Sequence, residues 1–230
     1  MKGYKKIIWL FLLLGSIMCL ISCGKNKTTL TYIGHASVKI VASDGSVLYI
    51  DPAYYKWDYK NQPADYILVT HSHEDHKPAA VLKLKEGGQL IDNKKALKKG
   101  VYETFDLGPF KVEAVAAGGN LNHDVRYCVG YLVTVDGITI YHAGDTSKID
   151  QMKELSSRHI DYAMYPIDGI FNMDAIEATE VAELVGACCN IPIHEYDQGD
   201  SKKSDNFTPK GRMILEYGQT INIKPQKFNQ

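Results

Sequence analysis

Short apolar stretches rich in β-branched and aromatic residues recur along the chain, and clusters of polar and glycine residues separate them. This alternation is typical of β-strands joined by tight turns. Asp136-Gly137 is one such separator and has the composition of a hairpin turn. The pattern predicts strands at Leu30–Ile33, Ser37–Val41, Val47–Ile50, Tyr66–Thr70, Phe110–Val115, Gly130–Val135 and Thr139–His142.

Three other segments have helical features. In the clearest, apolar residues recur at the spacing of one helix face, Asn172 or Asp174 can cap the start, and Gly186 can end the helix. The expected helices are Asp174–Val185, a shorter one from Pro78 to Gly87-Gly88, and Ile149–Ser156. Strands come first in each half of the chain and helices follow, so the order of elements predicts a layered α/β sandwich.

The first 23 residues have the features of a secretion signal. Three lysines precede an apolar run, Ile7–Ile21, which is shorter than the roughly 20 residues that a membrane-spanning helix needs. The run ends at Leu20-Ile21-Ser22-Cys23, which resembles a bacterial lipobox. Such signals are cleaved before the cysteine, so we expect Cys23 to carry the lipid that anchors the protein to a membrane. An uncleaved amino-terminal anchor is the alternative.

This amino terminus defines the expected organisation of the chain. It predicts a signal peptide at residues 1–23, a short polar tether at 24–29 and a single folded domain at 30–230. Either form of the amino terminus places the domain in the cell envelope, outside the cytoplasm, on the periplasmic or outer face.

The composition indicates the class of protein and the partners that it excludes. Hydrophobic residues make up 45% and charged residues 23%, which is ordinary for a globular protein. Without the signal, 23 basic residues face 27 acidic ones, a net charge of −4 that argues against nucleic acid as a partner. The domain contains three cysteines, Cys128, Cys188 and Cys189. Their number is odd and two of them are adjacent in sequence, which makes disulfide bonds among them a poor framework, so we expect all three to be packing residues.

A cluster of histidines follows directly after the apolar stretch Tyr66–Thr70. In an extended chain, positions two apart point the same way, so His71 and His73 can face one metal ion. A turn would then bring Asp75 and His76 to a second ion, and imidazole and carboxylate suit zinc and similar divalent metals. A surface turn that is merely rich in histidine is the alternative, but His-x-His-x-Asp-His after an apolar strand is a specific metal-binding pattern.

Three further candidate ligands lie far along the chain, each beside an apolar stretch. His123 lies in a loop rich in glycine and asparagine, and Asp145 follows a strand end where Gly144 allows close approach of the backbone. His194 ends the apolar stretch Ile191-Pro192-Ile193. Each of these residues alone could be structural, but together with the first cluster they point to a metal centre.

These segments together resemble the metallo-β-lactamase fold superfamily of metal-dependent hydrolases. More narrowly, they resemble its small, lid-less bacterial and archaeal branch related to ascorbate-phosphate lactonases. The matching landmarks are Gly34-His35-Ala36-Ser37, Asp51-Pro52, Val69 to His76, Asn120 to His123, Gly130-Tyr131, Tyr141 to Thr146, Pro166 to Met173 and Pro192-Ile193-His194. The resemblance implies a four-layer αββα sandwich with its metals at one edge of the β layers.

The resemblance also assigns roles to residues. It implies two divalent metal ions, zinc with manganese or iron as alternatives, and a nucleophilic hydroxide shared between them. Asp75 is implied as the group that accepts a proton from the attacking water. The implied ligands are His71, His73 and His123 for one ion, Asp75, His76 and His194 for the other, and Asp145 for both. His35 and His142 are candidates for supporting these ligands from behind.

Three positions depart from the family pattern: Asp168, Asn172 and Glu195 stand where relatives usually have glycine, threonine and tyrosine. They leave open which ester, lactone, phosphodiester or amide bond of a small-molecule substrate the expected hydrolase cleaves. A non-catalytic metal-holding envelope protein and a mononuclear iron oxidoreductase on the same fold are the alternatives. The chain has no nucleophile elbow, Walker loop or dinucleotide fingerprint, which excludes other common enzyme classes.

Overall fold

The structure, a computed structural model, describes residues 26–54, 56–195 and 203–228. The predicted signal peptide, with the lipidation site Cys23, lies outside the described residues, so its cleavage and lipidation stay predictions. Among the described residues, no helix is long and apolar enough to cross a bilayer.

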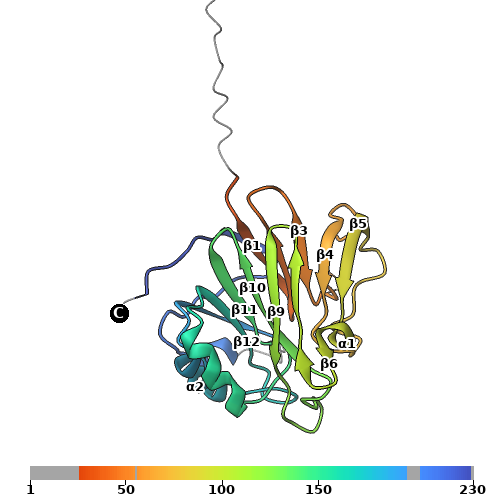
Figure 1. The fold of residues 1–230 in the computed structure, drawn as a ribbon. Helices are drawn as coiled ribbons and strands as arrows, with labels where there is room; N and C mark the ends of the chain where they lie inside the picture. Colours follow the sequence, from red (N-terminus) through yellow and green to blue (C-terminus); the bar gives the residue numbers. More distant parts are fainter. Residues whose placement is uncertain (1–25, 55, 196–202, 229–230) are drawn as a thin grey trace, which may run out of the picture.

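Two six-stranded sheets form the body of the molecule (Figure 1). In the first, β1 to β3 and β14 run antiparallel, and β3, β4 and β5 run parallel. Its spatial order is β14 (Gln219–Asn222), β1 (Thr29–Gly34), β2 (Ser37–Val41), β3 (Val47–Ile50), β4 (Ala64–Leu68) and β5 (Leu84–Ile91).

The second sheet repeats this mixture of antiparallel and parallel pairs. Strands β8 to β11 form antiparallel pairs, whereas β11, β12 and β13 run parallel. Its spatial order is β13 (Cys189–Ile193), β12 (Tyr162–Pro166), β11 (Ile138–His142), β10 (Val129–Val135), β9 (Phe110–Ala116) and β8 (Thr104–Leu107). A small hairpin of β6 (Leu97–Lys98) and β7 (Val101–Tyr102) follows the short helix α1 (Asn93–Ala96).

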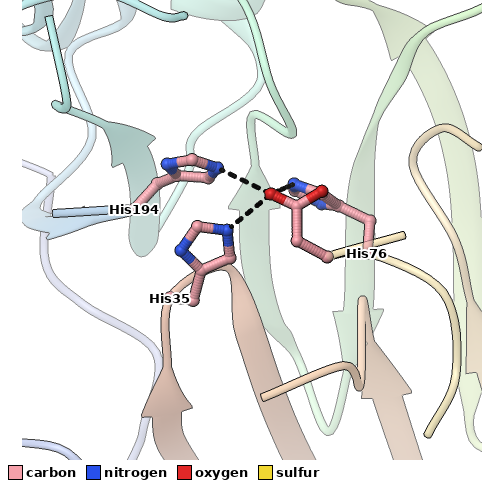
Figure 2. A group of neighbouring side chains, drawn as sticks. His35, His76 and His194 are labelled. Carbon is pink, nitrogen blue, oxygen red and sulfur yellow. Dashed lines mark hydrogen bonds and ion pairs between the residues drawn. The ribbon is translucent and has the colours of Figure 1, made fainter. Parts of the chain in front are cut away.

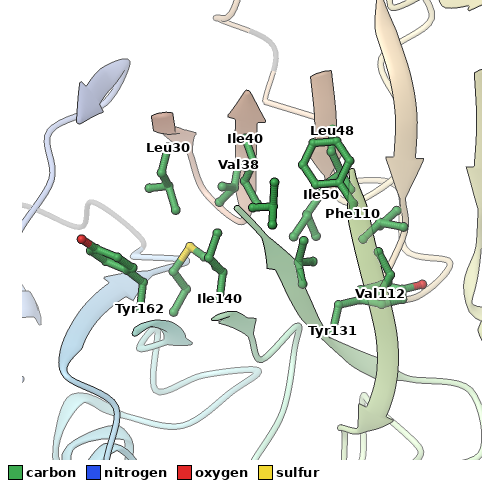
Figure 3. Packing of buried hydrophobic residues seen from close by; sticks show 14 of the residues in the cluster. Leu30, Val38, Ile40, Leu48, Ile50, Phe110, Val112, Tyr131, Ile140 and Tyr162 are labelled. Carbon is green, nitrogen blue, oxygen red and sulfur yellow. The ribbon is translucent and has the colours of Figure 1, made fainter. Parts of the chain in front are cut away.

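The main hydrophobic core lies between the two sheets. Alternate residues of each strand point inward, so that Leu48 and Ile50 enter this core while Tyr49 faces the opposite side. Figure 3 shows side chains of the first sheet, such as Val38 and Ile40, opposite side chains of the second, such as Val112 and Ile140. Each such fully buried side chain contributes about 1.5–3 kcal/mol, so the sandwich supplies a firm base for the loops at its edge.

The outer faces of the two sheets are covered differently. Helix α2 (Ala175–Val185) and the 3₁₀ helix η1 (Asp150–Ser157) cover the second sheet (Figure 1). Over the first sheet, irregular chain takes this place, with Trp57, Tyr59 and Leu82 packed against outward-facing residues. The predicted metallo-β-lactamase sandwich is confirmed, with its long helix on the second sheet.

Several element predictions are also confirmed. Helix α2 begins after Asp174, whose carboxylate accepts hydrogen bonds from two backbone amides, and it ends at Gly186 in the left-handed conformation. The segment predicted as a third helix forms η1, which is a 3₁₀ helix. The predicted strand Tyr66–Thr70 begins and ends two residues earlier, as β4.

The helix predicted from Pro78 is wrong. Most of its second half belongs to β5, which pairs in parallel with β4 so that Tyr66 lies opposite Gln89 and Leu68 opposite Ile91. Strand β5 lies at the edge of its sheet and exposes most of its side chains, so its polar sequence lacks the pattern of a half-buried strand. The turn residues Gly87 and Gly88 lie inside this strand.

Candidate metal centre

All seven predicted ligands lie in loops that directly follow strands or connect them at one edge of the sandwich. The loop after β4 carries four of them, and the others come from the β9–β10 loop, the end of β11 and the end of β13. Gly144 makes the turn before Asp145 possible, because a Cβ atom there would lie 2.8 Å from the carbonyl oxygen of Val129. The sheet therefore places distant parts of the sequence around one point.

The buried carboxylate of Asp145 lies at the centre of four imidazole rings. Its Oδ2 atom is 3.2 Å from Nε2 of His123, 3.3 Å from Nε2 of His194 and 4.0 Å from Nε2 of His71. Its Oδ1 atom is 3.3 Å from Nε2 of His76. Four histidines from three separate loops thus direct the same ring nitrogen at one carboxylate.

A second carboxylate, Asp75, lies at the outer side of this cluster and is half exposed. Its Oδ2 atom is 3.0 Å from Nε2 of His35, 3.9 Å from Nε2 of His194 and 4.0 Å from Nε2 of His76. Figure 2 shows the three labelled histidines arranged around one carboxyl group. The structure therefore brings His35, predicted only as a supporting residue, into contact with the predicted catalytic carboxylate.

The donor atoms fall into overlapping groups in which all ligand atoms lie within 4.8 Å of one another. One group contains His71, His73 and His123, and in this group only His73 is exposed. The other groups are His35, Asp75, His76 and His194, and His71, His76 and Asp145. Each is large enough to hold a metal ion, and the third joins the other two.

Asp51 fixes two of the imidazole rings from behind. His76 donates from Nδ1 to Oδ2 of Asp51 over 2.8 Å. The Thr70 hydroxyl donates to the same oxygen over 2.7 Å, so it accepts from Nδ1 of His71, 3.1 Å away. Both rings consequently have Nδ1 occupied from behind and direct Nε2 at Asp145.

The other two buried rings are held in the same way by one loop. His123 donates from Nδ1 to the carbonyl oxygen of Phe171 over 3.2 Å, and Nδ1 of His194 lies 3.1 Å from Oδ2 of Asp168. All four rings around Asp145 therefore have an acceptor oxygen near Nδ1; for His194 this contact is the ion pair with Asp168. This is the arrangement that a metal-binding histidine requires, because only Nε2 is then left to bind the metal.

The hydrogen bonding of the cluster tests whether a cation fits. Nε2 of His71, Nε2 of His76 and Oδ1 of Asp145 are buried and make no hydrogen bond. A buried polar atom left in this state costs about 1–3 kcal/mol, so three of them side by side are costly unless a ligand satisfies them. Two ring nitrogens and a carboxylate oxygen that face each other are a donor set that fits a divalent metal ion.

The cluster opens to the surface. A pocket of about 230 Å³ lies over it, lined by His73, Asp75, Asn122, His123, Asp145, Phe171 and His194. Drug-sized ligands occupy pockets of about 300–1,000 Å³, so this one fits a small substrate or the end of a larger one. Five of the seven predicted ligands face it, so a substrate in the pocket can reach the donor cluster.

With this geometry in place, the similarity to known proteins identifies the family. Residues 29–194 match the Beta-lactamase superfamily domain. The chain belongs to the β-lactamase superfamily. It is 30% identical to the UPF0173 metal-dependent hydrolase of Shouchella clausii, and the match covers 84% of this chain and 99% of that relative. The UPF0173 metal-dependent hydrolase of Methanoregula boonei is 32% identical over 86% of this chain and 99% of its own length.

Solved structures agree with this family assignment. A Parabacteroides distasonis protein, provisionally described as a metal-dependent hydrolase, matches with a TM-score of 0.69 at 30% identity, over 82% of this chain and 91% of its own. Igni18, described as a metallo hydrolase of Ignicoccus hospitalis, matches in fold with a TM-score of 0.66 at 22% identity, over 86% and 99% of the two chains. The narrower relation to ascorbate-phosphate lactonases stays a prediction.

The electrostatics of this β-lactamase-superfamily site centre on Asp145. Burial raises the pKa of Asp145, but His76 and His194 outweigh burial and hold it well below its ordinary value. Burial lowers the pKa of His194, but Asp145 raises it to about 9. Burial and the neighbouring His76 lower the pKa of His71 to about 3. A buried carboxylate in this position is stabilised by positive charge, which protons or a divalent cation can supply.

Backbone strain also collects at this site. His35, Asp51 and His194 adopt left-handed backbone conformations, with φ of 54°, 46° and 54°. Each such non-glycine residue costs about 1–3 kcal/mol. The hydrogen bond from the backbone amide of His194 to the carbonyl of His35 joins two of them across the two sheets. Three strained residues beside one donor cluster indicate that the fold maintains this geometry at a cost in stability.

The structure also gives the contacts of His142 and of the three residues that depart from the family pattern. His142 is buried and donates from Nε2 to the carbonyl of Ala36, while its Nδ1 accepts from the backbone amide of Gly144. It thus ties the turn before Asp145 to the turn that carries His35, without touching a predicted ligand's donor atom. Asp168 contacts His194, Asn172 donates to Asp168, and Glu195 accepts from the backbone amide of Ser204.

The sequence did not predict the contacts of Asp51 and Asp168 with the histidines. Asp51 directly follows β3, so the same end-of-strand position that singles out Asp145 could have marked it. Asp168 lies two residues after the end of β12, but the sequence pattern does not predict β12.

Proposed function

We propose that this chain is a metal-dependent hydrolase that cleaves an ester, lactone, phosphodiester or amide bond of a small molecule with two divalent metal ions. The observation that carries the proposal is the buried Asp145 carboxylate, surrounded by Nε2 of four histidines beneath an open pocket. The relatives named metal-dependent hydrolases support the same activity.

The donor groups support a division between two ions. The proposed ligands are His71, His73 and His123 for the first ion, Asp75, His76 and His194 for the second, and Asp145 for both. Zinc suits this set of imidazoles and carboxylates best, and manganese or iron can take its place. When bound, such ions polarise a carbonyl or phosphoryl oxygen and lower the pKa of water at the site.

The chain's own residues would then position the substrate and move the proton. Asp75 lines the pocket, and the hydrogen bond from His35 is the main cause that holds its pKa below its ordinary range, so it stays ionised. The Asp75 carboxylate can accept the proton of the attacking water. Between turnovers, the hydrogen bond from Nε2–H of His35 stabilises the ionised carboxylate. The carbonyl-anchored His123 and the deeply buried His76 keep the opposite side of the site fixed.

A panel of chromogenic esters, lactones and phosphodiesters tests the activity. We expect turnover of at least one class, its loss on dialysis against a chelator, and its return when zinc or manganese is added. Turnover that survives complete metal removal would contradict the proposal. Elemental analysis should find two metal ions per chain, and one iron per chain would instead favour an oxidoreductase on this fold.

We also propose that the mature protein is anchored in the cell envelope by lipid on Cys23, with residues 24–29 as its tether and 30–230 as its hydrolase domain. The lipobox-like Leu20-Ile21-Ser22-Cys23 supports this proposal, and the superfamily match begins at residue 29, where the tether ends. The test is mass spectrometry of the protein from membranes. A Cys23→Ala variant should lose the acyl mass and leave the membrane fraction.

A further inference from the structure

The segment Asp168–Met173 forms a tight turn around one buried carboxylate. Oδ1 of Asp168 accepts hydrogen bonds from the backbone amides of Ile170 and Phe171, each over 2.7 Å, and from that of Asn172 over 3.3 Å. The side-chain amide of Asn172 donates to Oδ2 over 2.6 Å. Asp168 is only 1% exposed, so its carboxylate is bound by groups of the protein and is shielded from solvent.

Two of the proposed ligands rest on this turn. Oδ2 of Asp168 lies 3.1 Å from Nδ1 of His194, and the carbonyl of Phe171 accepts from Nδ1 of His123 over 3.2 Å. The two histidines belong to different donor groups, and both direct Nε2 at Oδ2 of Asp145. One carboxylate therefore acts directly on one ligand and, through the turn that it closes, on the other.

We propose that Asp168 is a positioning residue for the metal centre: it holds His194 by direct contact and His123 through the Phe171 carbonyl. The inference rests on the proposed metal-dependent function and adds a residue to it. A carboxylate behind a metal-binding imidazole fixes the ring and makes it a stronger donor, and its loss typically lowers metal affinity about 10- to 100-fold.

Asp168→Asn separates the two contacts. Three backbone amides point at Oδ1, so the oxygen of the new amide stays with them and the turn remains closed. Its NH₂ group then faces Nδ1 of His194, where donor would meet donor, whereas the Asn172 side chain can turn its Oδ1 toward the new NH₂ group and accept from it. Asp168→Ala removes both contacts and also opens the turn.

Asp174, directly after this segment, offers a matched control. It caps helix α2 through the backbone amides of Ile176 and Glu177 and contacts no proposed ligand. Asp174→Ala should lower the midpoint of thermal unfolding by about 2–4 °C without acting on the histidines. A purely structural Asp168 would behave like Asp174.

The experiment titrates the metal-free parent, Asp168→Asn, Asp168→Ala and Asp174→Ala with zinc in competition with a chromophoric chelator, and records their thermal unfolding. We expect Asp168→Asn to weaken one zinc equivalent about 10- to 100-fold and leave the other nearly unchanged. Asp168→Ala should weaken both, and Asp174→Ala neither. Cobalt titration gives a second readout, since the absorption of the weakened equivalent should appear only at higher cobalt concentration.

The possible failures are distinguishable. If Asp168→Asn binds both equivalents as the parent does, or if Asp174→Ala weakens binding equally, the positioning role is wrong while the metal centre stands. If the metal-free parent binds neither zinc nor cobalt, manganese or iron at this site, the proposed function fails.

Discussion

The inner and outer sides of the metal centre are built differently. On the inner side, His71, His76, His123 and His194 are buried, and each Nδ1 atom meets an acceptor that lies behind the ring. On the outer side, His73 and Asp75 are exposed, and the structure gives Asp75 one close partner, His35. The inner side is fixed before any ligand arrives, whereas the outer side faces the substrate pocket. The comparison indicates that metal affinity depends mainly on the inner side and turnover on the outer.

Loss of Asp145 should break both sides at once, because it lies between all donor groups. In Asp145→Asn the central negative charge disappears while four imidazoles remain around it. We expect loss of both zinc equivalents and a fall in hydrolysis of at least about 100- to 1,000-fold. Elemental analysis beside a turnover assay checks this, and a variant that keeps both ions would remove Asp145 from the centre.

Asp75→Asn should separate the two sides most clearly. His76, His194 and Asp145 remain for the second ion, so a sample saturated with zinc should still hold both ions, although the second binds more weakly. The amide cannot accept the proton, so kcat should fall about 100- to 10,000-fold. Unchanged turnover in a zinc-loaded sample would show that another group takes the proton.

Asp51→Asn should weaken the inner side from behind. His76 and Thr70 both donate to Oδ2 of Asp51, and an amide nitrogen cannot accept from them. We expect zinc affinity to drop about 10- to 100-fold, with turnover recovered when zinc is in excess. Turnover that stays low in saturating zinc would mean that Asp51 acts on the chemistry rather than on binding.

His35→Ala should give the smallest change. It removes the hydrogen bond to Asp75 but no buried donor. The expected result is a kcat lower by roughly tenfold with unaltered zinc affinity, since a supporting contact is worth less than the group that it supports. Steady-state kinetics and chelator competition on the same sample measure both, and a large loss of affinity would instead make His35 a ligand.

The sequence predicts the ligand residues of both sides better than the residues that hold the ligand rings in place. His71 to His76 form a local pattern after a strand, and Asp145 and His194 follow apolar stretches, so they can be found by reading along the chain. The partners of their Nδ1 atoms cannot, because Asp51 and His76 are 25 residues apart and meet only when β3 and β4 pair. Contacts of this kind depend on strand register, which a single sequence does not determine.

The same reason explains the misses in the fold. Strands β12 and β13 form the end of the second sheet's parallel part, with β13 at the edge, and β12 is buried along its whole length. The sequence of β12, Tyr162–Pro166, is almost uniformly apolar and shows no period of two. The prediction for edge strand β5 is wrong for the opposite reason, because its polar sequence favours a turn or a helix.

Diffraction at the zinc absorption edge from crystals of the zinc-loaded protein tests the central claim most directly. The account predicts two anomalous peaks in the cluster, each about 2.0–2.1 Å from its imidazole nitrogens, with the Asp145 carboxylate contacting both. Peaks that lie away from His71, His123 and His194, or no ordered zinc in this pocket, would contradict it.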